Sequence, residues 1–451
     1  MAQRNVYVKN PVGMFLVSHK AGPPNIPSNG HSFSPVVSGD GWVAAYTSSA
    51  TDIDPDGDLN GTKTDVLRVN GTRVSGGQTA AEIISVGRDG LQDTSPTFAG
   101  ATTSGGGPLG RVVNKDGSLI LFHAAFCSLQ AAGEDFACQI GEINCLCASP
   151  AGGCDGSCFF TFQQVYLFKN DTFTVSRVSR TYRGLFRAGN GTSKSASLNV
   201  DAVTLATAVI VFSSVAVDLR CNPAVDDPNG IEDIFMIRAA DVDTPEICPV
   251  NVTLGGNGES TAPKLSPGGN EVVFVSAADN LTPDDNDPGK RDIFVADIAG
   301  GVVGTIREYS VSTSGTEANN HSSNPDIAGE GKIIVYESSA TNLQSPDPNG
   351  STWDIYETLS GGKFIRGDAD GDGTLEQDDD FDFLEAYLFQ GGAPPPPPCL
   401  DAANANDNGN IDISDLAVIG AGGPFPPPSP ACGNEPSSSG DGFSCAFHPC
   451  Q

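Results

Sequence analysis

Residues 272–295 read VVFVSAADNLTPDDNDPGKRDIFV, two apolar runs joined by an acidic loop that contains Pro and Gly. Short apolar runs bounded by Asn, Asp, Pro and Gly are typical of β-strands. The second run opens with the phrase Asp-Ile-Phe-Val, and related phrases recur along the chain. The six copies begin at Asn5, Asp65, Gln164, Asp233, Asp292 and Asp354, with spacings of 60, 99, 69, 59 and 62 residues.

Three other phrases keep step with this repeat. Variants of Ser-Pro-x-x-Ser occupy residues 34–38, 95–99, 195–199, 262–266 and 324–328. Alternating strands that end in Ser or Ala follow at 42–48, 119–124, 209–214, 272–276 and 333–338. A further strand follows each Asp-Ile-Phe-type phrase, at 15–18, 83–86, 175–179, 250–254 and 309–312. Four strands about every 60 residues predict the blades of a β-propeller.

The repeat resembles that of TolB-like, or PD40-type, β-propellers. The matching segments are 34–41 (SPVVSGDG), 50–53 (ATDI), 60–61 (NG), 338–343 (SSATNL) and 349–350 (NG). The resemblance covers residues 1–366 and implies an all-β fold, a five-bladed β-propeller with six blades as the alternative. It implies little about activity, because one fold hosts many functions.

The count of strands is uneven. The Asp-Ile-Phe-type phrase occurs six times, but the two strands expected before it occur together five times. Residues 5–18 therefore form a surplus N-terminal hairpin with an open edge, which must be covered. Truncation of an upstream blade and packing within the same chain are two explanations. Strand donation to a neighbouring molecule is the third, and it predicts a head-to-tail homo-oligomer or polymer.

Charge and cysteine content bound the environment. The 451 residues include 55 acidic and 24 basic side chains, a net charge of −31, which repels nucleic acid and attracts cations such as Ca²⁺. The sequence contains no run of 18 apolar residues, so we expect no membrane span. Twelve Cys and eight N-x-S/T sequons favour an extracellular or cell-surface protein that carries glycans. No signal peptide follows Met1, and we expect a mature or truncated chain.

A Cys-rich insert at 126–163 interrupts the second blade. Disulfides are favoured there, with a zinc site as the alternative, and six Cys leave the connectivity open. Cys221 and Cys248 are expected to pair with each other. The six cysteines of the insert are Cys127, Cys138, Cys145, Cys147, Cys154 and Cys158.

Two calcium loops are predicted after residue 366. The first, residues 368–379, has oxygen-bearing residues at alternate positions and Gly373 at the sharp turn. Its predicted ligands are Asp368, Asp370, Asp372, Thr374 and Asp379. A helix is expected at 381–389. The second loop, residues 404–415, begins with Asn and is expected to bind more weakly through Asn404, Asn406, Asn408, Asn410 and Asp415.

These loops resemble a type I dockerin, because both end in Asp and a short helix follows each. The segments 391–403 and 426–433 are closer still to the dockerin-like tails of planctomycete secreted proteins. The resemblance covers a small α module at 367–451 and implies a cohesin-like or cell-surface partner. The acidic blade loops at 52–58, 226–229, 284–287 and 347–349 either bind Ca²⁺ or form Asx and Pro turns.

Catalytic motifs are weak in this sequence. The five His form no H-x-x-x-H pair, and the sequence contains no G-x-S-x-G or Walker A motif. We assign no catalytic residue and expect that the protein is not an enzyme. The favoured function is a secreted, calcium-binding structural or adhesive protein that assembles head to tail into a filament. The alternatives are an extracellular polysaccharide hydrolase or lyase with a dockerin-like anchor, and a carbohydrate- or peptide-binding module.

Overall fold

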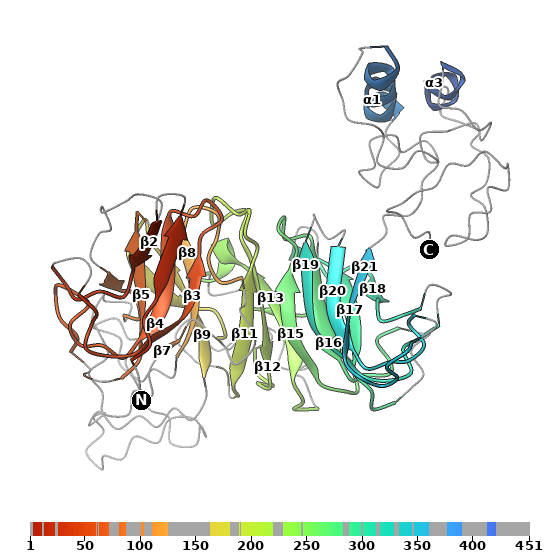
Figure 1. The fold of residues 1–451 in the computed structure, drawn as a ribbon. Helices are drawn as coiled ribbons and strands as arrows, with labels where there is room; N and C mark the ends of the chain where they lie inside the picture. Colours follow the sequence, from red (N-terminus) through yellow and green to blue (C-terminus); the bar gives the residue numbers. More distant parts are fainter. Residues whose placement is uncertain are drawn as a thin grey trace. The chain divides into compact units, whose positions relative to one another are not determined.

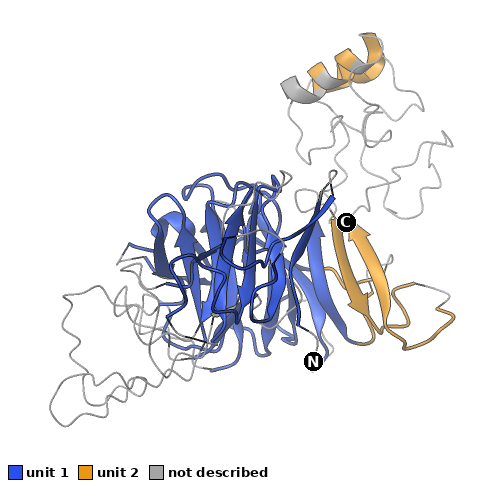
Figure 2. Ribbon diagram, turned by 60° about the vertical axis from the view of Figure 1, so that its left-hand side comes forward, with its two compact units in different colours: residues 1–308, 321–330 blue, residues 309–320, 331–451 orange. Residues whose placement is uncertain are grey.

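The computed structural model falls into two compact units (Figure 2). Unit 1 comprises residues 1–308 and 321–330, and unit 2 comprises 309–320 and 331–451. The structure describes residues 3–10, 13–22, 26–59, 61, 63–71, 81–86, 101–102, 111–124, 163–180, 189, 191–219, 229–244, 247–282, 288–298, 301–312, 316–328, 333–344, 347–359, 377–389 and 413–420.

Unit 1 begins with a hairpin and continues with four sheets. The hairpin pairs β1 (Tyr7–Asn10) with β2 (Gly13–Leu16). Sheet I is β3 (Ser32–Val37), β4 (Val43–Ser48), β5 (Asp65–Asn70) and β6 (Glu82–Ile83). Sheet II is β7 (Ala101–Thr102), β8 (Leu119–Ala124), β9 (Gln164–Lys169) and β10 (Thr174–Arg177).

Sheets III and IV repeat this plan. Sheet III is β11 (Ser193–Leu198), β12 (Val209–Ser214), β13 (Asp233–Arg238) and β14 (Val250–Asn251). Sheet IV is β15 (Ser260–Leu265), β16 (Glu271–Ser276), β17 (Asp292–Asp297) and β18 (Ile306–Glu308). A further strand, β19 (Ser322–Ala328), lies against β15, β16 and β17.

Each sheet is antiparallel, with its strands side by side in chain order (Figure 1). The central register is the same in every sheet, since the last residue of the second strand faces the first residue of the third. The third strands begin at the residues where the repeated phrase was predicted to begin, from Asp65 to Asp292. The predicted all-β architecture of repeated four-stranded sheets, as in a β-propeller, is confirmed.

The first strand of three sheets contains a β-bulge. The register shifts after its second residue, and the third residue has a positive φ: 51° at Ser34, 51° at Ser195 and 53° at Ala262. Asn324 in β19 repeats this conformation, with φ 50°. A bulge leaves one residue out of the ladder, so the Pro that follows Ser34, Ala262 and Asn324 loses no ladder hydrogen bond. This explains the spacing of the Ser-Pro phrase.

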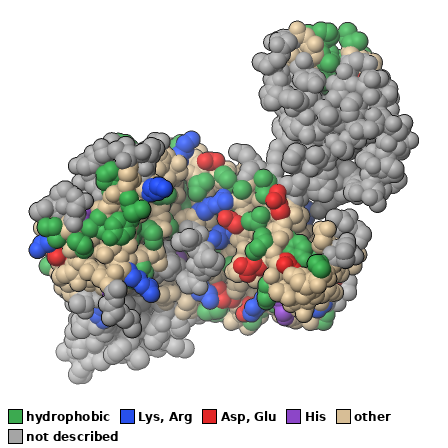
Figure 3. Space-filling view, viewed as in Figure 1, with side chains coloured by type: hydrophobic (Ala, Val, Ile, Leu, Met, Phe, Trp, Pro, Cys, Tyr) green, Lys and Arg blue, Asp and Glu red, His purple; other side chains and the backbone are tan. Residues whose placement is uncertain are grey.

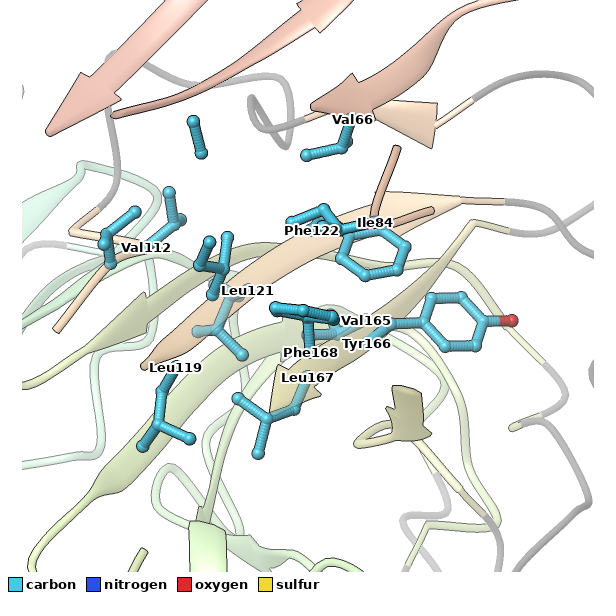
Figure 4. Close-up of a cluster of buried hydrophobic side chains, with 14 of the residues drawn as sticks. Val66, Ile84, Val112, Leu119, Leu121, Phe122, Val165, Tyr166, Leu167 and Phe168 are labelled. Atoms are coloured by element: carbon cyan, nitrogen blue, oxygen red, sulfur yellow. The ribbon is translucent and has the colours of Figure 1, made fainter. Parts of the chain in front are cut away.

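The core of unit 1 lies between its sheets. One continuous apolar cluster runs from Val6 and Val17 of the hairpin region to sheet III, and a second joins sheets III and IV. Figure 4 shows Val66 of sheet I close to Phe122 of sheet II. Aromatic rings also stack across the two central strands, with centroids 5.5 Å apart for Phe122–Tyr166 and 5.9 Å for Phe274–Phe294. Both faces of each inner sheet are therefore covered, as close packing of the interior requires.

Unit 2 contains two strands and two helices. Strand β20 (Ile333–Ser338) pairs with β21 (Asp354–Leu359), and the rings of Tyr336 and Tyr356 stack at 5.9 Å. Helix α1 (Gln377–Phe389) contains the predicted 381–389 helix and packs against α3 (Ile413–Gly420). None of the helices that the structure describes is long and apolar enough to cross a membrane.

Some predicted boundaries were wrong. The fourth strand of sheet IV is Ile306–Glu308, whereas residues 309–312 were predicted. Tyr309 and Ser310 are buried beyond the strand end, so an apolar signal was read as part of the strand. The fourth strands of the other sheets also end earlier than predicted, and β2 begins at Gly13 rather than at residue 15.

Other predictions fall outside the described residues. They are the 95–99 phrase, the 126–163 insert apart from Gln163, and the boundary between 366 and 367. The number of blades stays a prediction. Cys248 is disulfide-bonded, but Cys221 lies outside the described residues, so their pairing also stays a prediction.

Candidate functional site

The predicted calcium ligands lie almost entirely outside the described residues. The structure places Asp379 in helix α1 and Asp415 in the first turn of α3, where the Asp415 side chain is fully buried. The other eight residues are not described, so the two calcium loops stay predictions. These eight predicted ligands are Asp368, Asp370, Asp372, Thr374, Asn404, Asn406, Asn408 and Asn410.

Unit 1 contains two carboxylates that sequence reasoning did not bring together. Carboxylate oxygens of Asp292, at the start of β17, and Glu308, at the end of β18, lie within 4.8 Å of each other. They belong to the one group of His, Cys, Asp and Glu side chains among the described residues that could hold a metal ion. Asp292 is buried and Glu308 is half-buried.

The same place in sheet III shows why this pair is unusual. There Asn251 faces Phe235, as Glu308 faces Phe294 in sheet IV, and Asn251 Nδ2 donates a hydrogen bond to Asp233 at 3.1 Å. In sheet IV a carboxylate replaces that amide donor. Two carboxylates this close favour a shared proton or a hard cation between them. The pair is thus a candidate metal site that does not itself identify the ion.

Elsewhere the first residue of the third strand has a structural role. Asp65 accepts a hydrogen bond from Ser85 Oγ at 2.8 Å, and Asp233 accepts one from Thr253 Oγ1 at 2.7 Å. Gln164 does the same with Ser179 at 2.8 Å. These bonds close the outer edge of each sheet, which explains why the phrase begins with a polar residue.

The acidic loop at 52–58 uses its carboxylates as turn acceptors. Asp52 Oδ1 accepts the backbone N–H of Asn29 at 2.8 Å. Asp54 accepts the N–H of Asp56 at 2.8 Å and that of Ile83 at 2.7 Å. Of the two interpretations of this loop, these contacts favour the Asx turn.

Three of the described histidines hold backbone groups. Nδ1 of His31 accepts the N–H of Arg4, and Nδ1 of His321 accepts the N–H of Arg291, both at 3.1 Å. His123 is fully buried in β8, and its Nε2 accepts the N–H of Ala196 at 3.4 Å. Burial lowers the pKa of His123 to about 4. None of these three contacts prepares a catalytic base.

A charged cluster lies where the inner strands of unit 1 meet. The Arg111 guanidinium donates to the carbonyl of Leu265 at 2.9 Å and to that of Ile327, and it lies 3.3 Å from Asp326. Burial, together with the nearby Arg111, lowers the pKa of Lys264 although Asp326 opposes this shift. Arg111 therefore ties sheet II to sheet IV and to β19.

The β20–β21 pair has one uncovered face. The third residue of the second strand is fully buried in sheets I to IV, but Val335, at the same position, is 36% exposed. The second residue of the third strand is also fully buried in those sheets, but Ile355 is 73% exposed. Figure 3 shows hydrophobic side chains on the surface at this pair. The buried counterparts are Ala45, Leu121, Val211, Val273, Val66, Val165, Ile234 and Ile293.

The N-terminal hairpin is uncovered on one face as well. Val6 and Val17 are buried in the core of unit 1, and Val6 N–H donates to Ser18 Oγ at 2.9 Å, as in the outer strands of the sheets. Tyr7 is 55% exposed, whereas its counterparts in sheets I to IV are buried. Met14 is exposed beside Lys9 on the same face. The hairpin is thus the outer half of a blade, packed within its own chain.

Comparison with known proteins adds a likeness of low similarity. No protein-family model matches the chain, and no curated protein matches it. TolB from Acinetobacter baumannii is 15% identical over 73% of this chain and 56% of its own, with a TM-score of 0.32. An oligogalacturonate lyase from Vibrio parahaemolyticus is 10% identical over 83% and 76%, with a TM-score of 0.39.

A further similar structure is an oligogalacturonate lyase in complex with manganese. It is 12% identical over 77% of this chain and 73% of its own, with a TM-score of 0.35. This chain spans little more than half the length of the A. baumannii TolB. Likenesses at these values carry no conclusion about activity. The class defined by the sheets themselves is an all-β protein of the propeller kind.

Proposed function

We propose that this protein is a secreted, calcium-binding structural protein that associates with further copies of itself into an extracellular filament. The observation that supports this most is the uncovered apolar face of β20–β21. Its strand positions are fully buried in the four sheets of unit 1. Apolar sheet faces that lack a neighbour mark interaction surfaces or aggregation sites.

The charge of the chain is the second support. A net charge of −31 makes close approach of two copies unfavourable unless cations or oppositely charged groups lie between them. Calcium at the predicted loops, and a cation at the Asp292–Glu308 pair, would lower this repulsion. Assembly should therefore depend on divalent cations and on ionic strength.

A polysaccharide hydrolase or lyase is the rival function. Such an enzyme needs an acid and a base whose side chains are free to reach a substrate. The three described histidines above use a ring nitrogen to accept a backbone N–H, and Asp65 and Asp233 are occupied in closing their sheets. We therefore favour a protein that is not an enzyme.

Sedimentation and negative-stain microscopy of the full chain test the proposal. With millimolar Ca²⁺ we expect concentration-dependent growth into elongated particles, and with a chelator we expect smaller species. Calorimetry should detect Ca²⁺ uptake that is weakened when Asp370 and Asp372 are both replaced by Ala. A chain that stays monomeric at high concentration with Ca²⁺, or that releases new chain ends from acidic polysaccharides, would contradict the proposal.

A further inference from the structure

We propose that the uncovered face of β20–β21 binds the uncovered face of the β1–β2 hairpin of a second copy. This inference rests on the proposed self-association and names its joint. It treats the joint as a continuation, between molecules, of the sheet-on-sheet packing that builds unit 1. Two uncovered faces can join in this way only if one normally meets a following sheet and the other a preceding sheet.

Unit 1 shows the direction of stacking. In the second strands, odd-numbered positions face the following sheet: a Cβ on Gly117 of sheet II would lie 2.4 Å from Cβ of Val43, the first residue of β4. His123, the fifth residue of β8, accepts the N–H of Ala196 in sheet III. Even-numbered positions face the preceding element, since the hydroxyl of Tyr46, the fourth residue of β4, lies 3.5 Å from the carbonyl oxygen of Val17.

The two uncovered faces are therefore opposite in kind. Val335 is the third residue of β20, so its face is the one that meets a following sheet. Tyr7 stands on the third residue of its repeat phrase, opposite in register to the face of Val6, which packs on sheet I. Its face is the one that meets a preceding sheet. A following face and a preceding face are what each sheet contact in unit 1 brings together.

Composition and charge fit the same pairing. The β20–β21 face presents Ile333, Val335 and Ile355 beside the carboxylates of Glu337 and Glu357. The hairpin face presents Tyr7 and Met14 beside the ammonium group of Lys9. Apolar groups thus meet apolar groups, and in a strongly acidic protein a basic side chain meets two acids.

A second copy is the occupant because the hairpin has no place to fill in the sheet that contains β21. Completing a propeller with an N-terminal segment requires a missing strand, but β21 already occupies the third-strand position that β1 matches in sequence. Contact between unlike faces is heterologous, so it repeats from molecule to molecule unless the rotation closes a ring. The expected product is a head-to-tail filament.

Two blocked variants test the joint. Tyr7→Asp removes the hairpin face and keeps β20–β21, whereas Ile355→Asp does the reverse. Each variant alone should stay monomeric where the unaltered chain assembles, and their equimolar mixture should form a dimer of twice the monomer mass. Val302→Asp, at an exposed apolar residue elsewhere in unit 1, is the matched control and should assemble like the unaltered chain.

The outcomes separate the joint from the proposed function. If the unaltered chain assembles but the mixture stays monomeric, or if either variant still assembles, the joint is wrong and self-association stands. If Tyr7→Asp alone dimerises, the β20–β21 face binds itself and the joint is again wrong. If the unaltered chain does not assemble, both proposals fail. Thermal unfolding establishes that each variant is folded, and Val335→Asp replaces Ile355→Asp if the latter is not.

Discussion

Sheet IV of unit 1 and the β20–β21 pair of unit 2 share one strand pattern but differ in what covers it. Val273 and Ile293 in sheet IV are fully buried, whereas Val335 and Ile355 at the same positions are 36% and 73% exposed. On the other face, Phe274–Phe294 and Tyr336–Tyr356 stack at the same centroid distance of 5.9 Å. Burial of one face is therefore set by a neighbour and not by the strand's own residues.

The most disruptive test places a charge at the same position in both regions. Ile293→Asp buries a carboxylate between sheets and should cost more than about 4 kcal/mol of unfolding free energy. Ile355→Asp should change the stability of the dilute monomer by less than about 0.5 kcal/mol. Urea unfolding of both variants measures the contrast. Equal losses would mean that the β20–β21 face is covered within the molecule.

The buried His123 should make the interface of sheets II and III sensitive to acid. Its pKa falls from an unfolded value near 6.5 to about 4, so its contribution to stability is complete above pH 6.5 and is lost as the pH falls through 4. The loss amounts to about 3 kcal/mol. His123→Val, which copies Val275 at the same position of β16, should remove that part of the pH dependence in unfolding curves. An unchanged acid sensitivity would refute this assignment.

Removal of the Arg111 guanidinium should loosen the covered region from its inner side. Arg111→Met keeps the stem of the side chain but leaves the Leu265 and Ile327 carbonyls without this donor, at a cost of about 2 kcal/mol. Arg238→Met, which breaks an exposed pair with Asp241, is the control and should cost less than about 0.5 kcal/mol. Similar costs in denaturant unfolding would show that Arg111 does not brace the inner strands.

Glu271 gives the smallest expected effect and the opposite sign with pH. Burial raises its pKa to about 7; Asp297 adds to the shift, and Arg307 opposes it. The folded state therefore binds the extra proton, and stability falls as the pH rises from about 4.5 to 7. Glu271→Gln should gain about 1 kcal/mol over the native chain between pH 5 and pH 7.5, with the partial exposure taken into account. Glu259→Gln, at an exposed ion pair, should not.

The sequence predicted the strands well because their signal is local. Period-two alternation and the Ser or Asp at each strand end located the second and third strands to within one residue. Pairing across strands is not local, and so the approach of Glu308 to Asp292 was missed. Its detectable signal was a Glu in the fourth strand where the preceding repeat has Asn251.

The uncovered face could not be predicted from alternation alone. Strands β16 and β20 read EVVFVS and IIVYES, and both suit a buried sheet. The difference depends on whether another sheet follows. One signal was present: Glu357 stands where the third strands of sheets II to IV have Leu167, Met236 and Val295. The predicted calcium ligands remain to be tested because nearly all of them lie outside the described residues.

Hydroxyl-radical footprinting at increasing protein concentration tests the central claim most directly. With Ca²⁺ present, labelling of Tyr7, Met14 and Ile355 should fall together as the copies associate, whereas labelling of Val302 should stay constant. The two faces are predicted to become protected at the same concentration because each joint uses one of each. Constant labelling of Tyr7 and Ile355 in assembled material, or protection of only one face, would contradict the account.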